Sequence, residues 1–514
     1  MDLLLGIDIG TTHCKAGVYN EKGEKVILRK VKTETHTNKK DWSWYEADEL
    51  WLAVTKLLQE IFNHINPKKV IACSIASIGE SGVPIDKKGN AIYPIIAWFD
   101  QRSLPQAKKL EKILGIDKVF KISGLEINPI FSVPKIMWIK ENVPGAYIRT
   151  VKWLGITDYI IFKLTGEIIS NYSIASRTMA LDVTGKIWSE ELLSAVGINS
   201  NLFPNLKASG VVVGKVNKNA AKETGLLSGT LIVNGGHDHF CGSLASGMLL
   251  GNRVLDSSGT AESINIILKQ KTPPTNKYRG FRIGRYLDPE LIYAVGGIIA
   301  SGGAVDWLKD RIASLSDWDE SGSISYDIII KKAEETPLGA RGLLFLPHLR
   351  GGGAPNWDST SRGALIGLKT THTSPEIFRA LIEGLCFEVK AILEAIKEIV
   401  GYPIEIMTTI GGGTKNKFWQ QTKANITGIT VEIPDIEEAT AMGAALLAGI
   451  GAGVYKDMLS ASKLTYRVKE RYFPNKEANE FYKEIYQTYL KLYPVLKNIN
   501  FDLSSLLNKY RNTL

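Results

Sequence analysis

The chain opens with LLLGIDIGTTHCKAGVYN at residues 3–20, where two apolar runs flank a short glycine turn. Apolar runs of this length, bounded by turn residues, are typical of buried strands, so the stretch predicts strands over 3–9 and 14–19. Gly10 lets the backbone turn tightly, and the exposed N–H groups and hydroxyls of Thr11 and Thr12 can donate to phosphate oxygens. Asp8 would repel a phosphate, so we interpret it as a ligand of Mg²⁺. Taken alone, the stretch fits an ordinary hairpin turn equally well.

The same pattern occurs again near the middle of the chain, as DSSGT at residues 256–260. Strands are predicted over 253–256 and 261–267, on either side of this second turn. Two glycine–threonine turns, one in each domain, would approach a single polyphosphate from two sides. This arrangement differs from a P-loop, because GxxxxGK[ST] occurs nowhere in the sequence.

Strand and helix patterns alternate after both turns. Residues 47–63 carry apolar side chains at helical spacing, and 70–76 form a buried type of strand. The clearest helix has Ser374 as its N-cap and Pro375 as its first residue. The alternation predicts an α/β fold in which mixed sheets are flanked by helices. We predict an N-terminal domain over 1–246, a second domain over 247–455, a hinge at 242–251 and a helical C-terminal extension over 456–514.

The composition excludes several classes of protein. Hydrophobic residues make up 44% and charged residues 22%, which is ordinary for a globular protein, and 514 residues are too many for one core. The net charge of +9 is spread along the chain, so we expect no nucleic-acid partner. The N-terminus lacks the basic start of a signal peptide, no apolar run approaches ~18 residues, and the four cysteines are scattered. We therefore expect a cytoplasmic protein with no membrane contact, and leave a homodimer open.

A third glycine-rich loop, Gly411-Gly412-Gly413, follows a predicted strand over 404–410 and precedes a helix that contains Asn416. Its backbone can lie against a flat nucleotide base, with the Asn416 amide available to that base. Each glycine loop is weak support for nucleotide binding by itself. The three together, in this order, are much stronger support.

These segments resemble the FGGY carbohydrate kinase family, within the larger actin-like ATPase fold, over roughly residues 3–455. Further segments resemble it in the same order: FSVPKIMWIKEN at 131–142, NYSIASRTM at 171–179, RGALIGLKTTHTSPEIFRALIEGLCFE at 362–388 and ATAMGAALLA at 439–448. Ile130 departs from the first of these signatures, which usually has an aromatic or small residue there. The resemblance implies two actin-like (ribonuclease-H-like) domains with the active site in the cleft between them. It also implies ATP and Mg²⁺ as cofactors, and transfer of the γ-phosphoryl group of ATP to a hydroxyl of a small sugar, ketose, polyol or sugar acid.

Asp238 matches the general base of that family by position. The chemistry agrees, because an attacking hydroxyl needs its proton accepted and one carboxylate suffices. Asp238 follows a predicted strand over 230–234, so His237 and His239 would share one face and Asp238 the other. A zinc site at the two histidines is the alternative, although we see no third ligand nearby.

Gly79 and Glu80 match the family's substrate loop, where relatives place a carboxylate or histidine that binds a hydroxyl. Trp98 and Asp100 match a motif beside the same cleft, and an aromatic face with carboxylates suits a polyhydroxylated ligand. Their alternative is structural, with Trp98 in the core and Asp100 paired with Arg102. Glycerol kinases have an arginine at the position of Gly79 and a tyrosine at that of Ile130, and xylulokinases have Met-His at 79–80. The sequence fits neither well, so we expect a different pentulose, hexulose, polyol or sugar acid.

The resemblance gives a nucleotide-binding set with Asp8 as the Mg²⁺ ligand: Gly10, Thr11, Thr12, His13, Lys15, Gly259, Thr260, Gly302, Gly412 and Asn416. Two other functions remain as alternatives. An actin- or chaperone-like ATPase would have the same turns but would not need the Glu80 loop or Asp238. A His-Asp-His metallohydrolase would leave the duplicated turns unexplained.

Overall fold

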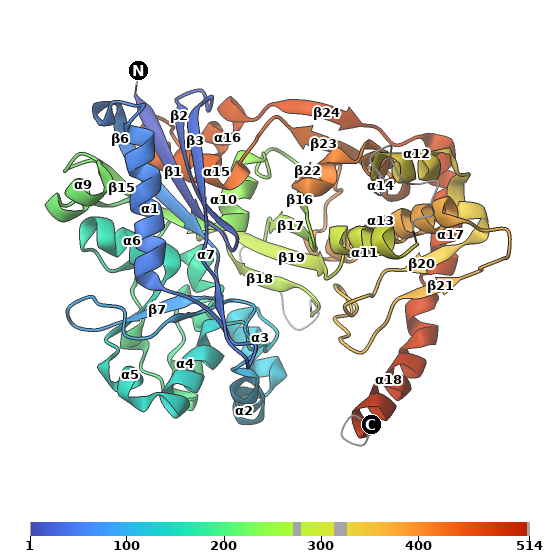
Figure 1. The fold of residues 1–514 in the computed structure, drawn as a ribbon, viewed down its shortest axis with the longest axis horizontal. Helices are drawn as coiled ribbons and strands as arrows, with labels where there is room; N and C mark the ends of the chain where they lie inside the picture. The colour runs from blue at the N-terminus through green and yellow to red at the C-terminus, as the bar shows by residue number, and fades with distance from the viewer. Residues whose placement is uncertain (1, 271–278, 313–325, 511–514) are drawn as a thin grey trace.

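The computed structural model describes residues 2–270, 279–312 and 326–510, and two β-sheets lie side by side in it (Figure 1). The first sheet is mixed, because β1 is antiparallel to β2 and parallel to β6. Its strands, in spatial order, are β14 (Val212–Lys215), β15 (Leu231–His237), β6 (Val70–Ser77), β1 (Leu3–Ile9), β2 (His13–Asn20) and β3 (Lys25–Lys32). The N-terminal hairpin predicted from the sequence is therefore confirmed as β1–β2.

The second sheet repeats this plan, with β16 antiparallel to β17 and parallel to β22. Its strands, in spatial order, are β18 (Arg282–Arg285), β19 (Ile292–Ile298), β17 (Glu262–Leu268), β16 (Arg253–Ser258), β22 (Ile406–Ile410), β23 (Thr430–Pro434) and β24 (Val468–Tyr472). Shorter strands form small separate pairs or a triple: β4 (His36–Thr37), β5 (Ser43–Tyr45) and β8 (Ile95–Ile96); β7 (Gly82–Ile85) and β9 (Lys152–Gly155); β10 (Ile169–Asn171) and β13 (Asn205–Lys207); β11 (Leu181–Asp182) and β12 (Ile187–Trp188); β20 (Leu344–Leu346) and β21 (Ala364–Ile366).

Helices cover both sheets, which confirms the predicted fold class. Those of the first half are α1 (Ala47–Phe62), α2 (Leu104–Leu114), α3 (Ile116–Ser123), α4 (Ser132–Asn142), α5 (Pro144–Arg149), α6 (Ile156–Thr165), α7 (Tyr172–Ala175), α8 (Glu190–Ala195), α9 (Lys218–Thr224) and α10 (Asp238–Ala245). Those of the second half are α11 (Gly302–Ile312), α12 (Tyr326–Glu335), α13 (Ser374–Val400), α14 (Lys417–Thr427), α15 (Ala439–Gly451), α16 (Met458–Thr465), α17 (Lys476–Tyr489) and α18 (Leu492–Tyr510).

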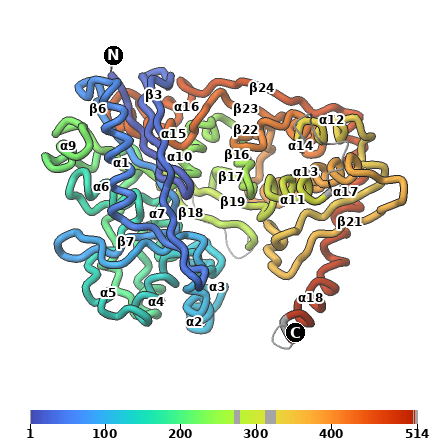
Figure 2. Tube along the Cα trace, viewed as in Figure 1, coloured from blue at the N-terminus to red at the C-terminus, as the bar shows by residue number. Residues whose placement is uncertain are grey.

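The alternation of side chains along β1 explains how the first sheet is covered. Leu5 and Ile7 point to the face that packs on α1 and α6, whereas Leu4 points to the opposite face. That opposite face is covered by α15, which comes from the second half of the chain and runs beside the blue strands in Figure 2. Contact is so close that a β-carbon at Gly6 would lie 1.9 Å from the carbonyl oxygen of Ala441. Helix α15 also packs along α10, with Gly443 against the backbone of Cys241.

Three local predictions need correction. The long helix is capped by Thr373, one residue before the predicted Ser374, because Thr373 and Glu376 form a reciprocal capping box. Gly242 lies inside α10, so that part of the predicted hinge is helical. The segment 456–514, predicted to be helical, also supplies β24, which completes the second sheet at its edge.

Two further observations bear on the chain's chemistry. All four cysteines are buried and free, which agrees with their scattered spacing. In the described ranges, no helix is long and apolar enough to cross a membrane.

Candidate active site

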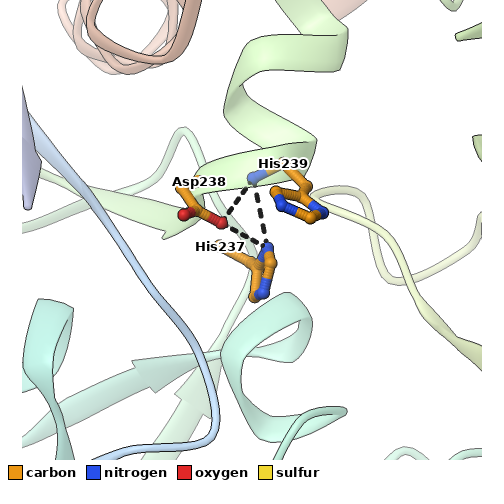
Figure 3. Close-up of side chains that lie close together, drawn as sticks. All are labelled: His237, Asp238 and His239. Carbon is orange, nitrogen blue, oxygen red and sulfur yellow. Dashed lines mark hydrogen bonds and ion pairs between the residues drawn. The ribbon is translucent and has the colours of Figure 1, made fainter. Parts of the chain in front are cut away.

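Asp238 lies where strand β15 ends and helix α10 begins (Figure 3). Its Oδ1 accepts a hydrogen bond from the backbone N–H of His239 at 2.7 Å and lies 2.9 Å from Nδ1 of His237. Its Oδ2 has no hydrogen-bond partner in the described part of the chain, and the side chain is 19% exposed. The predicted alternation of the three side chains is therefore wrong, because the strand ends at His237 and the helical turn brings all three together.

The surroundings keep the Asp238 carboxyl ionised. Burial alone would raise its pKa, but His237, His239 and the His239 backbone N–H outweigh burial and lower the pKa to about 2. Ligand atoms of the three residues lie within 4.8 Å of one another, so the group has the composition of a metal site. The same contacts also suit a carboxylate that is oriented through one oxygen and left open at the other.

Asp8 has a buried carboxyl group without a closely paired cation among the described residues. Its Oδ1 has no hydrogen-bond partner among the described residues, and its Oδ2 is 3.9 Å from Nζ of Lys15. Burial and the charges of Asp238 and Glu438 raise its pKa to about 8, against the opposite effect of Lys15. Lys15 lies closer to Glu438, at 2.6 Å. A hard divalent cation fits such an oxygen, so the residues present are compatible with Mg²⁺.

The turn of the first hairpin is open to a ligand. The Gly10 N–H donates to the His13 carbonyl at 3.1 Å and closes the turn, while Thr12 is exposed. Trp98 donates its indole N–H to the Thr11 hydroxyl at 2.9 Å, so the predicted acceptor-side aromatic contacts the predicted phosphate turn. Trp98 also packs edge-on against Phe99 and contacts the core.

The other glycines predicted to bind the nucleotide lie at or near the tip of the second hairpin, β16–β17. Gly259 and Thr260 form an exposed tip, and the Gly302 N–H donates to the Gly259 carbonyl at 2.9 Å. A β-carbon at Gly413 would meet the Ser258 hydroxyl at 2.3 Å, so the 411–413 loop lies directly on the same hairpin. At Gly412, by contrast, a β-carbon would meet nothing within 4 Å. The structure thus brings three distant glycine segments to one place.

Asn416 differs from its prediction, because its amide already has partners at both ends. Its Oδ1 caps α14 by accepting from the Trp419 N–H at 3.0 Å, and its Nδ2 donates to the Tyr326 hydroxyl at 3.0 Å. The amide predicted to be available to a base is therefore engaged in holding the start of the helix.

Glu80 lies at the centre of the predicted acceptor loop, buried and with a left-handed φ of 61°. A non-glycine residue in this region is strained, and such strain is typical of functional sites. Two N–H groups of Arg177 donate to its Oε1, one of them at 2.7 Å, while Oε2 has no partner among the described residues. Burial would raise the pKa of Glu80, but Arg177 and His237 lower it below its usual range.

The position of Gly79 leaves no room for a side chain. A β-carbon there would lie 2.6 Å from the His237 ring and 3.0 Å from Cγ of Arg177. The space that a larger side chain would need is therefore filled by Arg177, which reaches Glu80 from the 171–179 segment. Gly79 also links the Glu80–Arg177 pair to the His237–Asp238 pair.

Asp100 contradicts its prediction as a direct ligand, and the structural alternative holds. Both of its oxygens accept from the Arg102 guanidinium, at 2.8 and 2.9 Å, and the Ser43 N–H donates to Oδ2 at 2.5 Å. The side chain of Asp100 is fully buried, so no oxygen faces a ligand. Asp100 shapes the loop that carries Trp98.

Sequence reasoning missed two charged residues at these sites. Arg177 lies inside the NYSIASRTM segment, which resembles the family, but the sequence did not predict its pairing with Glu80. Nothing in the sequence indicated a role for Lys423, because its position is that of an ordinary lysine on an amphipathic helix. Its buried ammonium pairs with Asp256 and, at 2.6 Å, with Glu262.

The chain is similar to known proteins over nearly its whole length. The N-terminal and C-terminal domain models of the FGGY family of carbohydrate kinases match residues 3–245 and 256–452. A xylulose kinase of Bacillus subtilis (strain 168) is 30% identical over 98% of this chain and 99% of its own length, and a gluconokinase of Bacillus licheniformis is 27% identical over 96% of each. Among solved structures, a ligand-bound xylulose kinase from Lactobacillus acidophilus has a TM-score of 0.89 at 22% identity, covering 97% of this chain and 99% of that one. A glycerol kinase from Plasmodium falciparum with ADP has a TM-score of 0.86 at 22% identity, covering 96% and 98%.

Proposed function

This chain belongs to the FGGY family of carbohydrate kinases, and we propose that it transfers the γ-phosphoryl group of ATP to a hydroxyl of a small sugar, ketose, polyol or sugar acid. As a carbohydrate kinase it is a phosphotransferase with an alcohol group as acceptor. The observation that carries the proposal is the position of Asp238. It lies beside the Glu80 loop through Gly79 and His237, and its charge acts on Asp8 at the first phosphate turn.

In this proposal Asp238 is the general base. Its free Oδ2 accepts the proton of the attacking hydroxyl, while His237 and the His239 N–H hold Oδ1. Glu80 binds an acceptor hydroxyl through Oε2, and Trp98 offers an apolar face to the carbon skeleton. Asp100 is no longer proposed as a ligand.

The nucleotide end comprises the two turns and the glycines packed on the second. Backbone N–H groups and hydroxyls at Thr11, Thr12 and Thr260 are suited to phosphate oxygens, and Gly10 and Gly259 leave room for them because they carry no side chain. His13, Lys15, Gly302, Gly412 and Asn416 complete the proposed set. Asp8 would hold Mg²⁺, which neutralises charge on the phosphates when bound. The first domain, over 1–246, would then carry the acceptor, and the second, over 247–455, the nucleotide.

A coupled assay of ADP release with about thirty sugars, polyols and sugar acids tests the proposal. We expect slow release with ATP alone and strong stimulation by one acceptor, because a kinase must favour the acceptor hydroxyl over water. The phosphorylated product is then identified by mass spectrometry. Constant ATP turnover that no acceptor changes would contradict the proposal and favour an ATPase that uses ATP only to change shape.

A further inference from the structure

Arg282 is a cationic side chain on strand β18 that no part of the proposed mechanism uses. In the antiparallel register, Arg282 pairs with Val295 and Gly284 with Tyr293, so Arg282, Gly284 and Tyr293 share one face of the sheet. The ring of Tyr293 lies 4.1 Å from that of Phe240, two residues after Asp238 in α10. This face of β18–β19 is therefore directed toward the helix that carries the proposed base.

The same face also approaches the Glu80–Arg177 pair. A β-carbon at Gly284 would lie 2.7 Å from Cβ of Ser176, the residue before Arg177, and helix α7 packs against β18. Arg282 thus lies at the acceptor end of the site, contributed by the second half of the chain. The exposed tip at Gly259, where nucleotide phosphates are proposed to bind, joins β16 and β17, and β19 lies between β17 and β18 in that sheet.

Arg282 lacks a close ion-pair partner of its own among the described residues. Glu80 is paired with Arg177, whereas no carboxylate of the described residues lies within ion-pair distance of Arg282. The Arg282 guanidinium is half-buried and lies 5.0 Å from the centre of the Trp357 ring. Burial and the like charge of Arg177 lower its pKa to about 10. A partly buried cation of this kind needs a negative partner, and one carboxylate supplies it.

We propose that the acceptor is a hydroxy acid of the aldonate type, whose carboxylate binds Arg282 while one of its hydroxyl groups faces Asp238. This inference rests on the proposed function and narrows its substrate class. A carboxylate fits better than a phosphate, because a single guanidinium is unmatched and a carboxylate carries a single charge. Glu80 then binds a hydroxyl further along the same acceptor.

The experiment compares matched acceptors on the full-length enzyme: aldonates of four to six carbons, the alditols and ketoses of equal length, and the corresponding sugar phosphates. We expect kcat/KM to be highest for an aldonate. Arg282→Gln should lower kcat/KM for that aldonate by about 100-fold, mainly through KM, because a charged hydrogen-bond partner is lost. Arg282→Lys should recover part of the loss, since it keeps the charge but not the planar fork.

Arg279→Gln is the matched control, because Arg279 lies three residues away and pairs with the exposed Asp117. It should leave KM for the aldonate within about twofold. Calorimetric titration of the aldonate into each variant, with a non-hydrolysable ATP analogue present, reports binding separately from turnover, and thermal unfolding checks that each variant is folded.

The outcomes separate this inference from the proposed function. A neutral acceptor or a sugar phosphate that exceeds every aldonate, or an Arg282→Gln effect on KM for ATP instead of the acceptor, would overturn the inference and leave the kinase proposal standing. Absence of stimulation by any acceptor would count against both.

Discussion

The two glycine–threonine hairpins have the same sequence pattern but hold their aspartates differently. In the described ranges, Oδ1 of each aspartate is buried without a hydrogen-bond partner, so the difference lies at Oδ2. The cation near Oδ2 of Asp8 is Lys15, which is 3.9 Å away and lies closer to Glu438. Asp256 is clamped instead: the fully buried Lys423 donates to it, and Thr409 donates to the same oxygen at 3.1 Å. Lys423 also pairs with Glu262 on the returning strand.

This difference separates two tasks that one motif can serve. At the first hairpin, Asp8 has no closely paired cation among the described residues and can bind one from solution, as a ligand site requires. At the second hairpin, the Lys423 ammonium of α14 links Asp256 on β16 to Glu262 on β17. The Asp256 side chain therefore makes the hairpin itself more rigid. The carboxylates that we propose for catalysis therefore all lie in the first half, and the second half offers the proposed frame for the nucleotide.

Asp238→Asn tests the first half and should have the largest effect. Loss of a general base typically lowers kcat by ~10²–10⁴. Nucleotide affinity should change only a few-fold, because Asp238 lies at the acceptor side. Single-turnover kinetics and equilibrium binding of an ATP analogue measure the two quantities, and a variant that keeps more than a tenth of the wild-type kcat would remove Asp238 from this role.

Lys423→Met breaks the clamp in the second half. Removing one partner of a buried ion pair typically lowers the free energy of unfolding by about 3–5 kcal/mol. A loss of that size is expected here, because two carboxylates are left without a cation. Urea unfolding measures the loss. Lys417→Met on the same helix is the control, since that side chain is 76% exposed, and should change stability by less than about 0.5 kcal/mol. Equal effects of the two substitutions would abolish the contrast between the hairpins.

Glu80→Gln sharpens the assignment of the acceptor end. The substitution keeps the shape but weakens both the Arg177 pair and the bond to an acceptor hydroxyl, so KM for the acceptor should rise by about 10-fold or more. KM for ATP should hold within about twofold, because no described contact joins Glu80 to either turn. Should KM for ATP rise instead, Glu80 belongs to the nucleotide end.

Asp8→Asn tests the first hairpin through the pH dependence of stability in the absence of divalent cations. The pKa of Asp8 is raised in the folded state to about 8, so its contribution to stability is present below pH ~4 and is lost as the pH rises toward 8. The asparagine variant lacks this titration, so its stability relative to wild type should rise by about 1 kcal/mol per pH unit between pH 5 and 8. Thermal unfolding in EDTA from pH 5 to 8 measures the difference, and a difference that does not change with pH would show that Asp8 is already compensated.

Local patterns were enough to predict the hairpins, α1 and the long helix α13. Apolar period and turn residues act within a few positions, and Leu50 and Val54 are indeed buried on α1. The N-cap of α13 was misplaced by one residue because both Thr373 and Ser374 can cap, and only the bond to Glu376 decides between them.

The charges of the site could not be assigned in the same way. Asp100 and Arg102 are two residues apart, and the sequence could not tell whether that pair or a ligand holds the carboxylate. Glu80 meets Arg177 across 97 positions, and Asp256 meets Lys423 across 167. Such pairings depend on how distant loops, strands and helices pack within each half of the molecule, which periodicity does not encode. The cluster at Asp238 was misjudged for a smaller reason, a strand that continues to His237 before the helix begins.

Because α15 covers the first sheet, part of one face of that sheet stays exposed during synthesis until α15 has been made. The strands that α15 covers leave the ribosome long before residues 439–451, and at 5–20 residues per second the roughly 200 intervening residues take about 10–40 s to synthesise. During that interval the face around Leu4, Ala72 and Val233 lacks α15. The nascent first half therefore displays an apolar, glycine-lined surface that molecular chaperones can hold, and a chain released before residue 439 would keep that surface permanently exposed.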